Sequence, residues 1–299
     1  MFDFEYHSPG TMEEACLLLK KHDGQAQLLA GGTDLLPNIY NQKLAPEHVI
    51  NIKRIPLLND ITFDESKGIS LGTLVKFNEI IYSKTVQENF PVLVEVSKGI
   101  ASHQIRNLAT IGGNLCNAAP SADPAPILFA LDSLLTITGP GGKARSLPLE
   151  QFFTGPGKTA LAPAEILTRI HIPPLKKRTG MVYIKYSTRR ALEIAVVGVA
   201  ALIRLEKDTD KCRAARIVIS ACAPTPLRVH KAEEILTGKK ISDRDLEASS
   251  QAAGKAVKPI TDVRAGDTYR REMVRVQCKR ALKEALSRAQ SGKVAENKE

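Results

Sequence analysis

Two adjacent prolines, Pro173 and Pro174, divide the chain into two regions of different character. Proline fixes φ and lacks an N–H donor, so this pair, with the basic residues at 176–178, marks a boundary between elements. The length of 299 residues allows about two domains. Beyond the boundary, strand-like segments at 181–187, 195–204 and 214–220 precede helical patterns at 229–236, 245–256 and 269–289. This order predicts a small α+β domain with a three-stranded antiparallel sheet followed by helices.

The region before the prolines contains both helix-like and strand-like sequence patterns. Thr11 followed by Glu14 is a capping-box pattern and predicts that a helix begins there. A second helix is predicted at 92–100. Predicted strands lie at 2–6, 27–30, 48–52, 68–72, 133–138 and 166–172.

The first of two paired-glycine segments joins a predicted strand to a predicted helix and reads Leu29-Ala30-Gly31-Gly32-Thr33-Asp34-Leu35. Adjacent glycines tolerate positive φ and let a ligand approach the backbone. Successive N–H groups can converge on an anion, and the start of the next helix adds a favourable dipole. Taken alone, the pattern fits an ordinary tight turn equally well.

The second paired-glycine segment lies in a small, polar, turn-rich stretch from 110 to 126. It reads Thr110-Ile111-Gly112-Gly113-Asn114-Leu115-Cys116-Asn117. We interpret it as a loop that lies flat along a ligand, the alternative being an irregular surface loop. Neither segment has the GxGxxG spacing of a dinucleotide fingerprint. The stretch 155–159 resembles the end of a P-loop, but Phe152 occupies the required glycine position, so a turn is predicted there.

Charge, hydrophobicity and cysteine content bear on whether the chain binds nucleic acid, spans a membrane or holds a metal. The net charge is +10, but the basic residues are dispersed and only 5% of residues are aromatic, which does not favour nucleic-acid binding. No apolar run reaches the length of a membrane span, and no signal sequence is evident, so the cytoplasm is the predicted location. The five cysteines are scattered without a CxxC pair, which predicts reduced, mostly buried thiols and no metal.

Together, segments 30–35 and 110–118 resemble the FAD-binding subunits of molybdenum hydroxylases, a family that includes the medium subunit of carbon monoxide dehydrogenase and the flavin module of xanthine dehydrogenase. The resemblance covers nearly the whole chain. It implies a PCMH or vanillyl-alcohol-oxidase-type FAD-binding module at 1–175, made of two α/β subdomains at about 1–55 and 56–175. A C-terminal domain of the carbon monoxide dehydrogenase flavoprotein type would follow at 180–290, and a flexible tail at 291–299.

The same resemblance implies roles for individual residues. The first segment would wrap the FAD diphosphate through its N–H groups, and the second would add side-chain hydrogen bonds from Thr110 and Asn114. Asp123 would accept from ribose hydroxyls, while Leu167 and Lys185 would contact the flavin. No catalytic side chain is assigned. The full predicted set is Leu29, Ala30, Gly31, Gly32, Thr33, Asp34, Leu35, Leu36, Ile100, Thr110, Ile111, Gly112, Gly113, Asn114, Cys116, Asn117, Asp123, Leu167, Lys185 and Tyr186.

The implied function is electron transfer within a larger complex. A small subunit with [2Fe–2S] clusters would pass electrons to FAD in this chain, and a large subunit would hold the molybdenum cofactor, in a dimer of heterotrimers. The substrate is left open, as is the external acceptor, since Leu192 stands where NAD-dependent relatives have an acidic residue. The alternatives are a stand-alone FAD-dependent oxidoreductase of the vanillyl-alcohol-oxidase type and a nucleic-acid-binding module.

Overall fold

The computed structural model describes residues 3–189 and 192–292, which form two compact units. Unit 1 comprises Met1–Ile80, Ser102–Ala118 and Asp132–Pro173. Unit 2 comprises Ile81–Ala101, Ala119–Leu131 and Pro174–Glu299. Two segments predicted to lie in the N-terminal domain therefore pack with the C-terminal elements.

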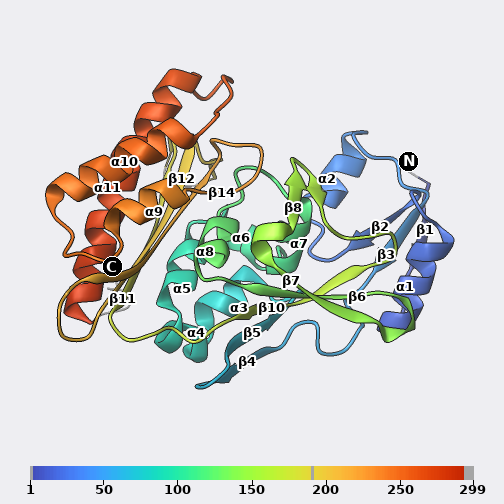
Figure 1. The fold of residues 1–299 in the computed structure, drawn as a ribbon. Coiled ribbons are helices and arrows are strands. Elements are labelled where there is room, and N and C mark those ends of the chain that lie inside the picture. The colour runs from blue at the N-terminus through green and yellow to red at the C-terminus, as the bar shows by residue number, and fades with distance from the viewer. Residues whose placement is uncertain (1–2, 190–191, 293–299) are drawn as a thin grey trace. The chain divides into compact units, whose positions relative to one another are not determined.

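Unit 1 begins with a parallel sheet in the order β1-β3-β2, made of Glu5–His7, His48–Asn51 and Ala26–Leu29. Helices α1 (Met12–Lys21) and α2 (Leu35–Tyr40) connect successive strands (Figure 1). The predicted capping box is confirmed, because Thr11 Oγ1 accepts from Glu14 N at 3.2 Å and Glu14 Oε2 accepts from Thr11 N at 3.3 Å.

A five-stranded antiparallel sheet completes unit 1, in the order β4-β5-β10-β6-β7. Its strands are Ile61–Asp64, Gly68–Gly72, Ile166–Ile172, Leu134–Thr138 and Ala144–Pro148. The predicted turn near residue 157 is confirmed as the tip of a hairpin between β8 (Phe153–Gly155) and β9 (Lys158–Thr159), with Gly157 at φ +68°. Short 3-10 turns lie at Pro140–Gly142 and Leu149–Gln151.

The second paired-glycine segment was wrongly predicted to be a loop. Residues Ile111–Asn117 form helix α7, preceded by the short helix α6 (His103–Arg106). Thr110 caps α7 by accepting from Gly113 N at 3.1 Å. The helix forms despite two glycines because its first turn is held both by this cap and by the backbone of unit 1.

Unit 2 contains an antiparallel sheet in the order β11-β12-β13-β14. The strands are Thr179–Tyr186, Val197–Leu205, Cys212–Ser220 and Leu227–Arg228. The sheet thus has four strands rather than the predicted three, since β14 is a two-residue strand too short to leave a periodic pattern in the sequence.

Helices cover both faces of this sheet. Eight of the nine residues of β12 are buried, and successive strand residues point to opposite faces. On one face lie the three predicted C-terminal helices, α9 (His230–Leu236), α10 (Asp243–Ala256) and α11 (Asp267–Ser291), around one apolar core. Helices α5 (Pro91–Lys98) and α8 (Pro124–Ala130) also contact the sheet (Figure 1).

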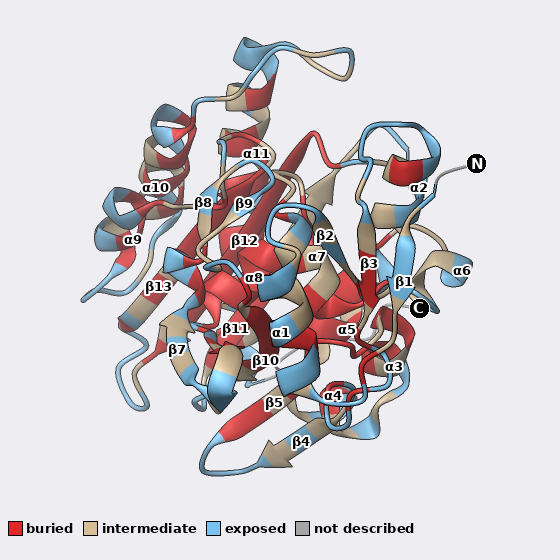
Figure 2. Cartoon of the chain, turned by 90° about the vertical axis from the view of Figure 1, so that its right-hand side faces the viewer, coloured by how far each residue is buried: buried red, intermediate tan, exposed pale blue. Residues whose placement is uncertain are grey.

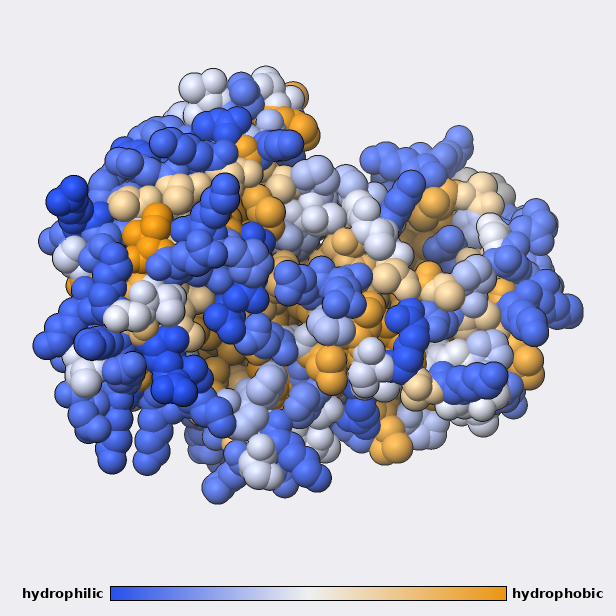
Figure 3. All heavy atoms as spheres, viewed as in Figure 1, coloured by the Kyte–Doolittle hydropathy of each residue, from blue (hydrophilic) through white to orange (hydrophobic). Residues whose placement is uncertain are grey.

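Two further short helices are α3 (Phe77–Tyr82), which crosses from unit 1 into unit 2, and α4 (Lys84–Asn89). Figure 2 shows the buried residues concentrated along strands such as β5, β10 and β12. Hydrophilic side chains cover much of the face seen in Figure 3. Within the described ranges, every helix is either too short or too polar to cross a membrane.

Candidate functional site: a cavity between two glycine segments

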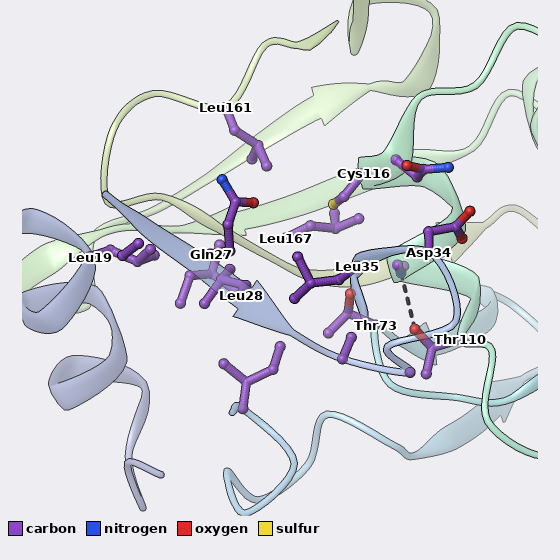
Figure 4. Close-up of a pocket in the computed structure, with 18 of the residues that line it drawn as sticks. Leu19, Gln27, Leu28, Asp34, Leu35, Thr73, Thr110, Cys116, Leu161 and Leu167 are labelled. Atoms are coloured by element: carbon purple, nitrogen blue, oxygen red, sulfur yellow. Dashed lines mark hydrogen bonds between the residues drawn. The ribbon is translucent and has the colours of Figure 1, made fainter. Parts of the chain in front are cut away.

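A cavity of about 580 Å³ in unit 1 brings the two paired-glycine segments together. This volume lies in the usual range for small-molecule sites. Figure 4 shows Asp34 and Thr110 toward one end of the cavity and Leu19 toward the other. The predicted residues that line it are Ala30, Gly31, Gly32, Thr33, Asp34, Leu35, Thr110, Gly112, Gly113, Asn114, Cys116, Asn117 and Leu167. Leu29, Leu36 and Ile111 neighbour these residues in the chain without lining the cavity.

The first segment packs closely against the backbone just before the second. A Cβ on Gly31 would lie 2.3 Å from the carbonyl oxygen of Leu108, so only glycine fits there. Gly32 has φ +78°, a conformation that other residues adopt only with strain. In the described part of the chain, no acceptor meets the N–H groups of Gly31, Gly32, Thr33 or Asp34. These donors are available to a ligand in the cavity.

The second segment uses its glycines differently. Ile111 N donates to Val75 O at 2.9 Å, and Gly112 N donates to Thr73 O at 3.0 Å. Gly113 N is taken by the Thr110 hydroxyl, and Asn114 N donates to Thr110 O at 3.0 Å. A Cβ on Gly112 would lie 1.7 Å from Thr73 Oγ1. The first turn of α7 is therefore packed tightly against the end of β5, and its N–H groups are already satisfied.

Asn114 supplies a buried polar atom that has no partner among the described residues. Its Oδ1 is buried and accepts no hydrogen bond, although the side chain borders the cavity. A buried acceptor left without a donor is unfavourable by about 1–3 kcal/mol. A ligand that donates a hydroxyl hydrogen in the cavity would relieve this penalty.

Desolvation perturbs both Asp34 and Cys116, which line the cavity. Partial burial raises the pKa of Asp34, which stands at the N-terminus of α2 without making a side-chain cap. Burial raises the pKa of the Cys116 thiol to about 12, so it stays protonated at neutral pH. A protonated thiol is a poor nucleophile. Cys116 therefore acts as a packing group rather than a reactive one.

Several residues that line the cavity are not in the set predicted from the sequence. Thr73 follows β5 directly, and the segment from Leu161 to Ile166 leads into Leu167 on β10. The only signal for Thr73 was its place after the predicted strand at 68–72. Gln27, His22 and Asp23 also border the cavity, from β2 and the turn before it.

The remaining predicted residues, Ile100, Asp123, Lys185 and Tyr186, lie in unit 2. There the structure brings Asp123 and Lys185 into an ion pair of 2.8 Å, and Tyr183 OH donates to the other oxygen of Asp123 at 2.8 Å. Burial raises the pKa of Asp123, and the Lys185 ammonium opposes that rise. Lys185 also donates to Gly99 O at 3.2 Å, next to the buried Ile100. Tyr186 OH lies 2.5 Å from Tyr269 OH.

The cavity of unit 1 fits the phosphate and polyol part of FAD. Its unpaired N–H groups match phosphate oxygens, and Asn114 Oδ1 matches a hydroxyl donor. Gly31 lets the first segment pack against Leu108, and Gly32 supplies its positive φ, so both glycines fix the backbone that carries these N–H groups. Two independent features of the cavity thus agree with the cofactor implied by the sequence.

Comparison with known proteins decides the family. Residues 2–175 match the model of the FAD binding domain in molybdopterin dehydrogenase, and residues 182–285 match the CO dehydrogenase flavoprotein C-terminal domain. The chain belongs to the FAD-binding medium subunits of molybdenum hydroxylases. The resemblance inferred from the two glycine segments is confirmed.

The relatives of this subunit match it from end to end. It is 36% identical to the xanthine dehydrogenase FAD-binding subunit of Escherichia coli O157:H7, over 97% of this chain and 98% of the relative. It is 34% identical to the carbon monoxide dehydrogenase medium chain of Hydrogenophaga pseudoflava, over 95% and 98%. A solved structure of carbon monoxide dehydrogenase from Hydrogenophaga pseudoflava, lacking the Mo-pyranopterin moiety of the molybdenum cofactor, matches with a TM-score of 0.91 and 35% identity, over 96% and 98%. The predicted fold class is confirmed, apart from the fourth strand in unit 2.

Proposed function

We propose that this chain is the FAD-carrying electron-transfer subunit of a molybdenum hydroxylase. The observation that carries the proposal is the run of N–H groups from Gly31 to Asp34 that have no acceptor among the described residues, in a segment that lines the same cavity as the unpartnered Asn114 Oδ1. Membership in a family of FAD-binding medium subunits supports it, and favours it over a stand-alone oxidoreductase.

The role of the chain is to bind and orient its cofactor. FAD, when bound, supplies a centre that exchanges electrons one or two at a time. In this proposal, the N–H groups of the first segment hold the diphosphate, and Asn114 fixes a hydroxyl of the cofactor. We also propose cofactor contacts for the unit 2 residues Ile100, Asp123, Lys185 and Tyr186, as the family resemblance implies. None of these residues needs to act as an acid or base.

We further propose the assembly and domain limits that the resemblance implies. A small [2Fe–2S] subunit would deliver electrons, a large subunit would hold the molybdenum cofactor, and the complex would be a dimer of heterotrimers. The FAD-binding domain would span 1–175 and the C-terminal domain 180–290. The free cysteines of the described residues, of which Cys16, Cys212, Cys222 and Cys278 are buried, support the reducing environment of the cytoplasm.

The experiment purifies the complex after co-expression of this chain with the small and large partner subunits, and separately purifies the chain alone. We expect flavin absorption in both preparations, released into the supernatant by acid because the cofactor is not covalently bound. A colourless complex that takes up no added FAD would contradict the proposal. Flavin that remains attached to the precipitated chain would favour the stand-alone oxidoreductase class instead.

A further inference from the structure

Three histidines from separate elements meet at the edge of the parallel sheet of unit 1. His7 ends β1, His48 begins β3, and His22 follows the last turn of α1. One nitrogen from each ring lies within 4.8 Å of the other two. In the described residues, this is the one group of three or more metal-ligating side chains that meets that distance. Figure 1 shows α1 beside β1 and β3, the elements that bring these residues together.

The nitrogen positions approach those of a metal site. His7 Nε2 and His48 Nδ1 are 3.1 Å apart. Two nitrogens on a tetrahedral zinc ion, each at about 2.0–2.1 Å from the metal, would be separated by about 3.3 Å. The same two nitrogens face the Glu5 carboxylate, at 3.9 Å from His7 Nε2 and 3.4 Å from His48 Nδ1. A fourth, anionic ligand is therefore within reach on the solvent side.

His22 completes the group and has an unexplained feature. Its Nε2 is buried and has no hydrogen-bond partner in the described part of the chain, and its ring lies 3.5 Å from that of His48 between centroids. The contact between His7 Nε2 and His48 Nδ1 requires one nitrogen to donate and the other to accept, so at least one of these two rings is neutral. A neutral ring keeps a lone pair available for a metal ion.

We propose that His7, His22 and His48 form a binding site for a divalent transition metal of the zinc class, with Glu5 as the fourth ligand. Imidazole is a preferred ligand for such ions, and this mixed nitrogen and carboxylate set suits zinc. The bound ion would tie β1 and β3 to the end of α1. The prediction of a metal-free chain was based on the scattered cysteines and did not consider histidines. The proposal does not depend on FAD binding.

Calorimetric titration of the purified full-length chain with ZnCl₂, after removal of metal by a chelator, tests the site. We expect one ion per chain, with at least about 10-fold weaker binding in His22→Gln and in His7→Gln. His230→Gln is the matched control, because that side chain is 58% exposed and lies in unit 2. It is expected to bind as the unaltered chain does.

Three results of the zinc titration, and one of the flavin measurement, would overturn the proposal. The three titration results are the absence of zinc binding by the unaltered chain, equal affinity in all variants, and an equal loss in His230→Gln. Using two separate ligand variants keeps the test decisive if one of them folds poorly. The flavin content of the same samples is recorded independently: a His22→Gln chain that loses flavin but binds zinc normally would place His22 in the cofactor site and also overturn the proposal.

Discussion

The two paired-glycine segments look alike in sequence but differ in what they leave unsatisfied. From Gly31 to Asp34, the N–H groups have no acceptor in the described chain. In α7, the N–H groups of Ile111, Gly112, Gly113 and Asn114 are all bonded within unit 1. Gly31 packs against Leu108 O much as Gly112 packs against Thr73, but of the two segments it is the first that leaves its N–H groups without acceptors among the described residues. A glycine pair is thus informative about ligand binding only once the destination of its hydrogen bonds is known.

Among the substitutions that test this difference between the two segments, Gly112→Ala is expected to have the largest effect on stability. The added methyl group would fall 1.7 Å from Thr73 Oγ1 and 2.6 Å from Thr73 O, so the backbone must shift. We expect the free energy of unfolding to fall by about 3 kcal/mol in urea denaturation of the flavin-free chain. Gly24→Ala, where a Cβ meets nothing within 4 Å although φ is +76°, is the control for general glycine effects. Equal losses in the two variants would refute the packing role.

Asn114→Leu separates stability from binding because the two are expected to move in opposite directions. Removing a buried, unpartnered acceptor is expected to raise the free energy of unfolding of the flavin-free chain by about 1 kcal/mol. The same change is expected to weaken FAD binding by about 10-fold, because a hydrogen bond to the cofactor is lost. Urea denaturation and flavin fluorescence titration measure the two quantities. Tighter FAD binding by Asn114→Leu would remove this residue from the site.

Thr110→Ala tests whether the second segment acts through its fold. Loss of the hydrogen bond from Gly113 N to the Thr110 hydroxyl is expected to lower the free energy of unfolding by about 1 kcal/mol. Thr110→Ser retains the cap and serves as the matched variant. We expect FAD affinity of the folded chain to change less than in Asn114→Leu. A larger loss of affinity than of stability would mean that the hydroxyl itself contacts the cofactor.

The smallest effect is expected on the pH dependence of FAD binding, through the carboxyl group of Asp34. Desolvation raises the pKa of this carboxyl above its ordinary value, so its burial penalty on the folded chain disappears as pH falls through the raised pKa. An ionised carboxylate also repels a bound diphosphate, so FAD affinity should rise over the same downward pH range. Asp34→Asn is expected to remove this dependence and to strengthen binding at neutral pH by roughly two- to five-fold. Titration of both chains between neutral pH and the limit of stability checks this, and parallel pH profiles would contradict it.

The sequence predicted the elements with strong periodic patterns and missed those fixed by tertiary contacts. The capping box at Thr11 and the strand at Ile166–Ile172 could be predicted because local residues determine them. Helix α7 could not, since glycine disfavours helix and the packing that offsets this comes from Thr73 and Val75, distant in the chain. Strand β14 was not predicted because two residues are too few to form a periodic pattern in the sequence.

The candidate site was only partly accessible to sequence reasoning. The glycine segments stood out by composition, and the structure brings them to one cavity. The residues around Thr73 in the sequence form no recognisable motif. Its packing against Gly112 became evident only from the structure, where a Cβ on Gly112 would clash with Thr73. The three histidines stand at positions 7, 22 and 48, so successive ones are separated by 15 and 26 residues. These separations are unlike the short spacings of familiar metal-binding motifs. Their proximity follows from parallel pairing of β1 with β3 and the return of α1 to the sheet edge.

Hydrogen exchange of backbone amides, followed by mass spectrometry with and without FAD, tests the central claim most directly. In the flavin-free chain, the amides of Gly31 to Asp34 should exchange rapidly because they lack acceptors, and those of Ile111 to Asn114 should exchange slowly. Addition of FAD is expected to protect the first group strongly and to change the second group little. Protection confined to the second group, with the first still exchanging rapidly in the FAD-bound chain, would contradict the account.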